Sequence, residues 1–238
     1  GLGDVYKRQL LISGDELVSP GCVRPNGAIW ESNGTLLETM LQSLGQTVHH
    51  RRVVPDQPDA LRQALGDLAI TCDAVVSTGG VSAGDSDWIR QLAAELGEVH
   101  FWKLFLRPGR PFAFGCLGDG VPLFGLPGNP VAAAITALQL LWPALQKLEG
   151  QSEPELFPRL QVELADPLAR RPGRPELARA RLETQDDGTL LARVNGSQAS
   201  SRIGSLQQAD LLLEIPADAD HLESGTRLWA QLLRPRLF

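Results

Sequence analysis

A glycine-rich loop at residues 77–87 (STGGVSAGDSD) gives the strongest chemical signal in the sequence. It lies between an apolar segment typical of a strand and a segment typical of a helix. Glycines let backbone N–H groups approach an anion closely, and the start of a helix adds partial positive charge. The loop favours phosphate binding, although alone it is also compatible with a tight turn. Its candidate contacts are Thr78, Gly79, Gly80, Ser82 and Asp85.

A second loop of the same kind occurs at residues 125–130 (GLPGNP). It too follows a predicted strand and opens a helix, and Pro130 suits the first helical turn. Two such loops in one open sheet favour a crevice at the carboxyl ends of the strands, where ligands of such folds bind. Gly128 and Asn129 are the candidate contacts here.

Between the two loops lies a basic segment, residues 103–111 (KLFLRPGRP), with three cations and no acid. The chain as a whole has a net charge of −6. Arginine can hold an oxyanion through two parallel hydrogen bonds. A solvated loop is the alternative, but the prolines stiffen the segment and favour ligand contact through Arg107, Arg110 and Pro111.

Carboxylates occur on two loops that should converge at the same edge of the sheet, namely Glu16, Asp85 and Asp87. One or two carboxylates together with substrate phosphates suffice to hold Mg²⁺. Glu16 could equally be an ordinary turn residue and Asp87 a helix cap. The spacing leaves both readings open.

Five arginines occur within twelve residues near the C-terminal third of the chain, with one acid, Glu176, among them. A polar stretch, residues 196–201 (GSQASS), follows. Arginines on an alternating strand are usually exposed, so solvent-facing positions are expected. The five are Arg170, Arg171, Arg174, Arg179 and Arg181.

The segments that carry these motifs alternate between strand and helix patterns. Ser32 and Asn33 can cap the first helix. The alternation predicts an α/β domain with a doubly wound, mostly parallel sheet over residues 10–150. Predicted strands are 10–13, 47–54, 73–77, 99–106, 111–116 and 121–126; predicted helices are 36–44, 59–68, 87–96 and 130–148.

After residue 150 the pattern changes to short alternating segments, at 160–164, 178–183 and 190–194, separated by prolines. They predict a smaller C-terminal β-domain, residues 151–238, built as a barrel or sandwich. Residues 1–9 have no periodic pattern and are treated as a segment that need not be native.

Composition excludes several classes of protein. The chain has 238 residues, 43% of them hydrophobic, which suits a soluble globular protein. Its negative charge argues against nucleic-acid binding. No apolar run is expected to span a membrane, which needs about 18 residues. Three scattered cysteines without a Cys-x-x-Cys pair indicate neither disulfides nor a thiolate metal site, and favour the cytoplasm.

Taken together, the motifs resemble those of the molybdopterin molybdenumtransferase family, which includes the corresponding domain of gephyrin. The resemblance covers about residues 10–233. It implies that adenylated molybdopterin and molybdate are converted into molybdenum cofactor and AMP, with Mg²⁺, by a homodimer. The motifs are GDEL at 14–17, SN at 32–33, TGGVS at 78–82, RPGRP at 107–111 and GLPGNP at 125–130.

The resemblance also implies roles for matching residues. Glu16 and Asp87, with Asp85 beside them, would form the acidic, metal-associated site. Arg107 and Arg110, with Pro111, would hold oxyanion and phosphate, while the Gly79-Gly80 loop and the Gly128-Asn129 turn would receive the pterin phosphate. Arg174 or Arg179 and a serine among residues 197–205, represented by Ser197, would complete the molybdate pocket.

The sequence departs from the family pattern in four respects, one of which is a serine segment a few residues longer than usual. The family often has lysine where Arg107 and Arg110 stand, and a serine where this chain has Ala132. The family's first two domains, which would precede Leu10, are absent, so a fragment is expected. Two alternatives stay open: a molybdopterin adenylyltransferase, which usually has TGGTG at the first loop, and a pterin-binding scaffold without turnover.

Overall fold

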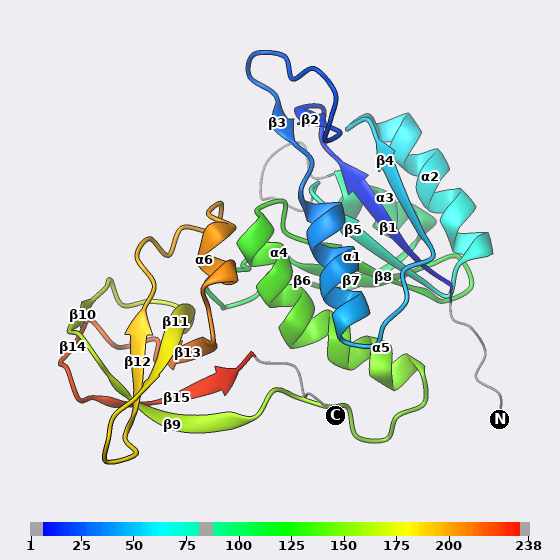
Figure 1. Cartoon of the computed structure of the whole chain (residues 1–238). Helices are drawn as coiled ribbons and strands as arrows, with labels where there is room; N and C mark the ends of the chain where they lie inside the picture. The colour runs from blue at the N-terminus through cyan, green and yellow to red at the C-terminus, as the bar shows by residue number, and fades with distance from the viewer. Residues whose placement is uncertain (1–6, 81–87, 234–238) are drawn as a thin grey trace. The chain divides into compact units, whose positions relative to one another are not determined.

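A computed structural model describes residues 7–80 and 88–233 of the chain. The chain divides into two units (Figure 1). The first comprises Gly1–Leu104 and Gly109–Pro154; the second comprises Phe105–Pro108 and Glu155–Phe238. The division after Pro154 falls close to the expected one at residue 150, but the short segment Phe105–Pro108 belongs to the second unit.

The first unit is built on a six-stranded sheet in the order β4-β1-β5-β8-β7-β6. The first four strands in this order run parallel, and β7 is antiparallel to both β8 and β6. The mostly parallel sheet predicted from the sequence is confirmed. The strands are β1 (Arg8–Ser13), β4 (His50–Val54), β5 (Ala74–Thr78), β6 (Gly97–Trp102), β7 (Ala113–Leu117) and β8 (Val121–Leu126).

Helices cover both faces of this sheet (Figure 1). Leu61, Leu65 and Ile89, from α2 and α3, pack on one apolar cluster. Leu37 and Leu141, from α1 and the last helix, pack on the other. Apolar residues at helical spacing therefore bury one stripe of each helix against the strands. The helices are α1 (Asn33–Ser43), α2 (Pro58–Thr71), α3 (Trp88–Leu96), α4 (Pro130–Thr136), η1 (Ala137–Leu141, a π-helical turn) and α5 (Trp142–Leu148).

The last three of these elements form one continuous helix, Pro130–Leu148, as predicted. Contrary to the expectation that no apolar run is long enough for a bilayer, its 19 residues have the length and hydropathy of a membrane span. However, 67% of its apolar window is buried within the protein. Such burial is typical of the core helix of a globular domain.

The second unit is a closed five-stranded barrel in the order β11-β12-β9-β15-β13. Its interior is lined by small and branched apolar side chains such as Val162, Ala180 and Leu213. The predicted barrel or sandwich is therefore a barrel. The strands are β9 (Arg159–Leu164), β11 (Glu176–Thr184), β12 (Leu190–Val194), β13 (Leu211–Ile215) and β15 (Arg227–Leu232), with β10 (Leu168–Ala169) paired to β14 (His221–Leu222) and one short helix, α6 (Gly204–Gln207).

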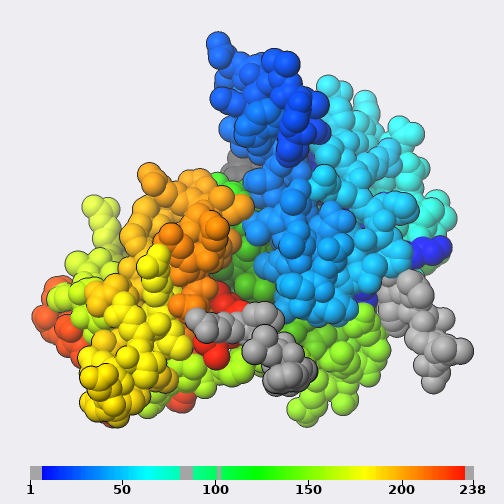
Figure 2. All heavy atoms as spheres, in the orientation of Figure 1, coloured from blue at the N-terminus to red at the C-terminus, as the bar shows by residue number. Residues whose placement is uncertain are grey.

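A two-stranded arm extends from the first unit. It consists of β2 (Leu17–Val18) and β3 (Ile29–Trp30), which pair in parallel, and of the loop that joins them. The arm projects beyond the helices of its own unit (Figure 2). It follows directly after the turn at the end of β1 and returns the chain to the start of α1.

Candidate functional site

The carboxyl ends of the parallel strands lie at one edge of the sheet. Ser13 at the end of β1 pairs with Val54 at the end of β4, and Thr78 pairs with Leu126 at the ends of β5 and β8. The loops that follow these four strands therefore start side by side. We call this part of the first unit the carboxyl edge.

The two glycine-containing turns meet at the carboxyl edge. A Cβ atom placed on Gly128 would lie 3.6 Å from the Cα of Gly79. Gly79 has a φ of +84°, and a Cβ there would lie 2.6 Å from the backbone oxygen of Ser13. A side chain at Gly79 would therefore both strain the backbone and clash with it. The close approach leaves backbone groups, not side chains, at the point where the two turns meet.

Polar groups of the first helix complete the carboxyl edge. The Asn33 side-chain amide donates a hydrogen bond of 2.8 Å to the backbone oxygen of Gly128. Its carbonyl oxygen is buried and has no hydrogen-bond partner among residues 7–80 and 88–233. Thr78 is 1% exposed, whereas Gly128 and Asn129 are exposed. An unpaired buried acceptor beside two exposed turn residues is what a donor on a ligand could satisfy.

The predicted cap of α1 is wrong in detail. Ser32 occupies the cap position but makes no side-chain capping hydrogen bond. The Glu31 carboxylate instead accepts a hydrogen bond of 2.7 Å from the backbone N–H of Gly34. Because Glu31 caps the helix, Asn33 is free to reach across to the second glycine turn.

Acidic side chains also gather at this edge. The Ser13 hydroxyl donates to Asp56 at 2.8 Å, and the Asp56 backbone N–H donates to Asp15 at 2.9 Å. Glu16 is exposed in the same turn. Sequence reasoning missed Asp56, which follows β4 in an unremarkable Pro-Asp-Gln-Pro turn. Within the described part of the chain, no group of three His, Cys, Asp or Glu side chains could hold a metal ion.

Three of the predicted site residues, Ser82, Asp85 and Asp87, lie outside the described residues. Gly80, the last described residue of the first glycine loop, has a φ of +62°.

The basic segment is divided between the two units. Lys103 and Leu104 pair through their backbones with Phe112 and Arg110 in the first unit. Arg110 is exposed and Pro111 is partly buried there. Arg107 instead belongs to the second unit, where its backbone N–H donates to Pro175 at 3.0 Å. Arg107 and Arg110, which are near each other in the sequence, therefore belong to different units.

In the second unit, one buried carboxylate faces several arginines. The Glu176 carboxylate lies 3.5 Å from Arg107 and 3.7 Å from Arg170. The side chains of Glu176 and Arg170 are each only 6% exposed. Arg174 donates to the backbone oxygen of Leu106 at 3.0 Å. We call Arg107, Arg170, Arg174, Arg179 and Glu176 the arginine cluster.

Arg179 is the most buried member of the arginine cluster, with 0% exposure. The expectation of solvent-facing arginines is wrong at this position. Its guanidinium donates to the Ser205 hydroxyl at 3.1 Å and to the Ala199 backbone oxygen at 3.4 Å. Its remaining terminal nitrogen, Nη1, has no hydrogen-bond partner among the described residues. Burial lowers the pKa of Arg179, and Glu176 partly opposes that shift.

The serine beside the buried arginine is Ser205 rather than Ser197. Ser197 accepts a weak hydrogen bond of 3.4 Å from the Ala199 backbone N–H. The Gln198 side chain makes two hydrogen bonds to the backbone of Arg179. It accepts from the Arg179 N–H at 2.8 Å and donates to the Arg179 carbonyl at 3.1 Å. The polar stretch thus packs over the outer side of β11 and buries Arg179.

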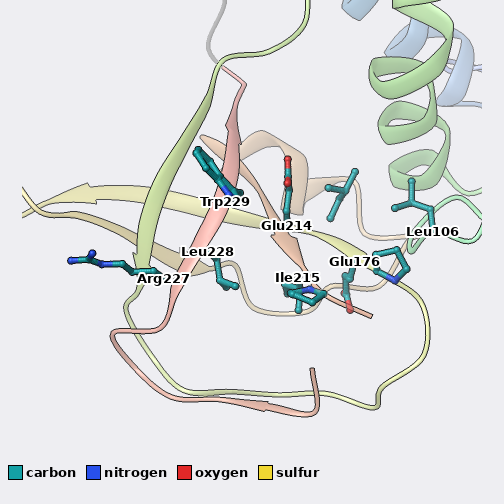
Figure 3. Close-up of a pocket in the computed structure, with 10 residues that line it drawn as sticks. Leu106, Glu176, Glu214, Ile215, Arg227, Leu228 and Trp229 are labelled. Atoms are coloured by element: carbon teal, nitrogen blue, oxygen red, sulfur yellow. The ribbon is translucent and has the colours of Figure 1, made fainter. Parts of the chain in front are cut away.

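A cavity of about 430 Å³ adjoins Glu176 in the second unit (Figure 3). Ile215, Leu228 and Trp229 give it a mainly apolar lining. Its charged groups are already paired, since Glu214 binds Arg159 at 2.6 Å and Arg227 binds Glu163 at 3.1 Å. The cavity therefore suits apolar groups.

Two family models match the chain. The first, described as a probable molybdopterin binding domain, matches residues 9–147. The second, described as the MoeA C-terminal region (domain IV), matches residues 161–233. The first model spans the α/β unit and the second spans the barrel.

Curated relatives match nearly the whole chain. Molybdopterin molybdenumtransferase of Haemophilus influenzae is 29% identical over 91% of this chain and 53% of its own length. Gephyrin of Dictyostelium discoideum is 30% identical over 95% of this chain and 36% of its length. The cinnamon protein of Drosophila melanogaster, named as a molybdenum cofactor synthesis protein, is 34% identical over 96% and 38%. The chain thus spans between about a third and about half of these relatives.

A solved structure has a similar fold. The crystal structure of the molybdopterin biosynthesis MoeA protein from Pyrococcus horikoshii superposes with a TM-score of 0.80 at 26% identity. The match covers 96% of this chain and 55% of that protein.

Proposed function

The chain belongs to the molybdopterin molybdenumtransferase family that includes gephyrin, and we propose that it is part of an enzyme that inserts molybdenum into adenylated molybdopterin. In this reaction the phosphoanhydride of the adenylated pterin is cleaved, AMP leaves, and the dithiolene sulfurs capture molybdenum from molybdate. Molybdate and the pterin nucleotide are both anions. Each needs its own positively polarised contact surface.

The meeting of Gly79 and Gly128 is the observation that carries the proposal. A Cβ placed on Gly128 would lie 3.6 Å from the Cα of Gly79, so two strand-to-helix turns lie close together on one edge, where backbone N–H groups can surround a phosphate. The second turn opens the long helix at Pro130, whose N-terminal end favours negative charge. Thr78 and Asn129 flank the turns and are proposed to orient the pterin phosphate.

The arginine cluster supports the binding of an oxyanion. A buried charge is costly unless it is paired, and Glu176 is the acid that faces these arginines. Arg179 presents an Nη1 group that lacks a partner among the described residues. A tetrahedral dianion such as molybdate can accept several guanidinium hydrogen bonds and offset the excess positive charge. We propose Arg107, Arg174 and Arg179 as its ligands within this unit. Arg110, in the first unit, is proposed separately as a contact for a phosphate.

The carboxyl edge can accommodate Mg²⁺ only with help from the substrate. Asp15 and Asp56 each use one oxygen in the hydrogen bonds described above, so each keeps a second oxygen, and Glu16 is exposed nearby. Mg²⁺ usually takes one or two protein carboxylates and completes its shell with phosphate and water. We propose Glu16 as its ligand in this chain, together with Asp85 and Asp87. A bound Mg²⁺ would offset the charge of the phosphates.

The release of AMP tests the proposal. A full-length protein containing this region, incubated with adenylated molybdopterin, molybdate and Mg²⁺, is expected to release AMP and to form molybdenum cofactor. The same mixture without molybdate is the control. A correctly folded protein that binds the pterin nucleotide yet releases no AMP would refute catalysis and favour a scaffold role.

An adenylyltransferase reaction is distinguished by its substrates and products. It would consume ATP and load molybdopterin with AMP, and it would not need molybdate. The match of the barrel to the MoeA C-terminal region favours the molybdate-dependent reaction. The proposal extends to a cytoplasmic homodimer, which light scattering of the full-length protein would check.

A further inference from the structure

A thiol, an imidazole and a carboxylate lie in line on the antiparallel part of the α/β sheet. Cys116 in β7 is the direct cross-strand partner of Glu98 in β6. The Sγ atom of Cys116 lies 3.5 Å from Nε2 of His100. The other ring nitrogen of His100, Nδ1, lies 3.4 Å from a carboxylate oxygen of Glu98. This is the order of groups in which a carboxylate orients an imidazole that accepts a thiol proton.

The local backbone explains why the three side chains meet. The register of β6 and β7 shifts between Val99 and Phe101, so His100 lies at a bulge. Bulges re-aim side chains, and here the imidazole turns toward Cys116. On its other side the ring packs against Phe114, with 5.8 Å between ring centroids. The phenyl ring thus limits the orientations that the imidazole can adopt.

This cluster is separate from the site proposed above. Cys116 pairs with Pro122 near the start of β8, whereas the second glycine turn follows the end of β8 at Leu126. The thiol therefore lies toward the opposite edge of the sheet from the carboxyl edge. The proposed pterin binding therefore assigns no role to Cys116.

The other two cysteines lack this environment. Cys22 is exposed and forms no disulfide with another described cysteine. Cys72 is buried, and burial raises the pKa of its thiol. Cys116 has intermediate exposure, and its partner His100 has a side chain that is 40% exposed. A small reagent can therefore reach Cys116 while a base stands beside it.

We propose that Cys116 is a nucleophilic thiol that undergoes exchange with small disulfides, with His100 as its base and Glu98 as the residue that positions His100. The Cys116 sulfur attacks one sulfur of the disulfide, the disulfide S–S bond breaks, and a mixed disulfide forms. The thiol proton passes to Nε2 of His100 and then to the departing thiolate. Cys116 is oxidised and the released half of the reagent is reduced, so no further oxidant is needed.

Site-resolved modification of the intact chain tests this inference. The protein is treated with oxidised glutathione, and the modified fraction at each cysteine is followed by mass spectrometry. Cys116 is expected to react about tenfold faster than Cys22 although it is less exposed, since a positioned base accelerates proton transfer. Cys72 is expected to react slowest. In urea the three rates are expected to converge.

Two variants assign the roles. His100→Gln is expected to slow Cys116 about tenfold and to leave Cys22 unchanged, while Glu98→Gln is expected to slow Cys116 only two- to threefold. Circular dichroism checks that both variants fold. If His100→Gln does not fold, the proposal is decided by the modification rates of Cys116 and Cys22. These rates are compared in the unmodified sequence and in Glu98→Gln. A Cys116 that reacts no faster than Cys22, or that ignores both substitutions, overturns the proposal.

Discussion

The carboxyl edge of the α/β unit and the arginine cluster of the barrel are both proposed anion sites, but different groups line them. At the carboxyl edge, Gly79 and Gly128 lie close together and bring no side-chain charge. In the arginine cluster, charged side chains crowd around one buried carboxylate, Glu176. One surface depends on close backbone approach and the other on uncompensated charge.

This difference predicts how each region responds to change. Backbone geometry is disrupted by adding atoms, and added anions cannot repair it. A surplus of buried charge is sensitive to the removal of a counter-charge, and a bound anion can compensate. Four substitutions test this difference between the two regions, and they are described from the largest expected effect to the smallest.

The substitution Gly79→Val is expected to have the largest effect. The residue has a φ of +84°, and a Cβ would lie 2.6 Å from the Ser13 backbone oxygen. Left-handed backbone costs an ordinary residue roughly 1–2 kcal/mol, and the clash adds to this. Urea denaturation is expected to show a loss of about 3 kcal/mol or more in the free energy of unfolding.

Gly66→Ala provides a control for the replacement of a glycine away from the carboxyl edge. Gly66 lies in α2 with open space around it, so alanine is expected to raise stability by up to about 1 kcal/mol. Equal losses at Gly79 and Gly66 would contradict the close approach at the carboxyl edge.

Glu176→Gln is expected to destabilise the barrel by about 3 kcal/mol, because it removes the counter-charge of Arg107 and Arg170. Added molybdate should restore part of this loss and should restore nothing in Gly79→Val. Thermal unfolding with and without molybdate measures both effects. Glu223→Gln is the control, since Glu223 is 75% exposed and pairs only with His221 in the described region. Loss of stability without rescue by any oxyanion would argue against an anion site here.

The two regions also differ in how far the sequence predicts them. The carboxyl edge follows from local patterns, since a strand, a glycine turn and a helix place the turn at the end of a parallel sheet. The burial of Arg179 depends on chain segments that are distant in sequence. Ala178 and Ala180 face the barrel core, as alternation requires. Arg179 points to the outward side, where Gln198 and Ser205 cover it. No local sequence pattern predicts that these residues bury Arg179.

A third substitution, Arg179→Met, is expected to change stability by less than about 1 kcal/mol. The hydrogen bonds to Ser205 and Ala199 are lost, but so is the penalty of burying a cation. Affinity for molybdate is expected to fall about tenfold or more, as for the loss of a charged hydrogen bond. Titration calorimetry compares it with Arg181→Met, an exposed arginine on the same strand. Strong destabilisation with unchanged molybdate affinity would mean that Arg179 stabilises the barrel and does not bind molybdate.

The smallest effect is expected where barrel charges are exposed and already paired. Arg193 donates to Glu183 at 2.7 Å and also pairs with Asp166. The hydrogen bond from Arg193 lowers the pKa of Glu183 below its usual 4.5. The pair therefore contributes stability above that pH, and the contribution is lost as the pH falls through the lowered pKa. Arg193→Gln should lower the thermal midpoint slightly at pH 6 in low salt, and the difference from the unmodified protein should shrink at pH 3. A difference that grows on acidification would mean that Arg193 stabilises the barrel through packing of its aliphatic stem rather than through its charge.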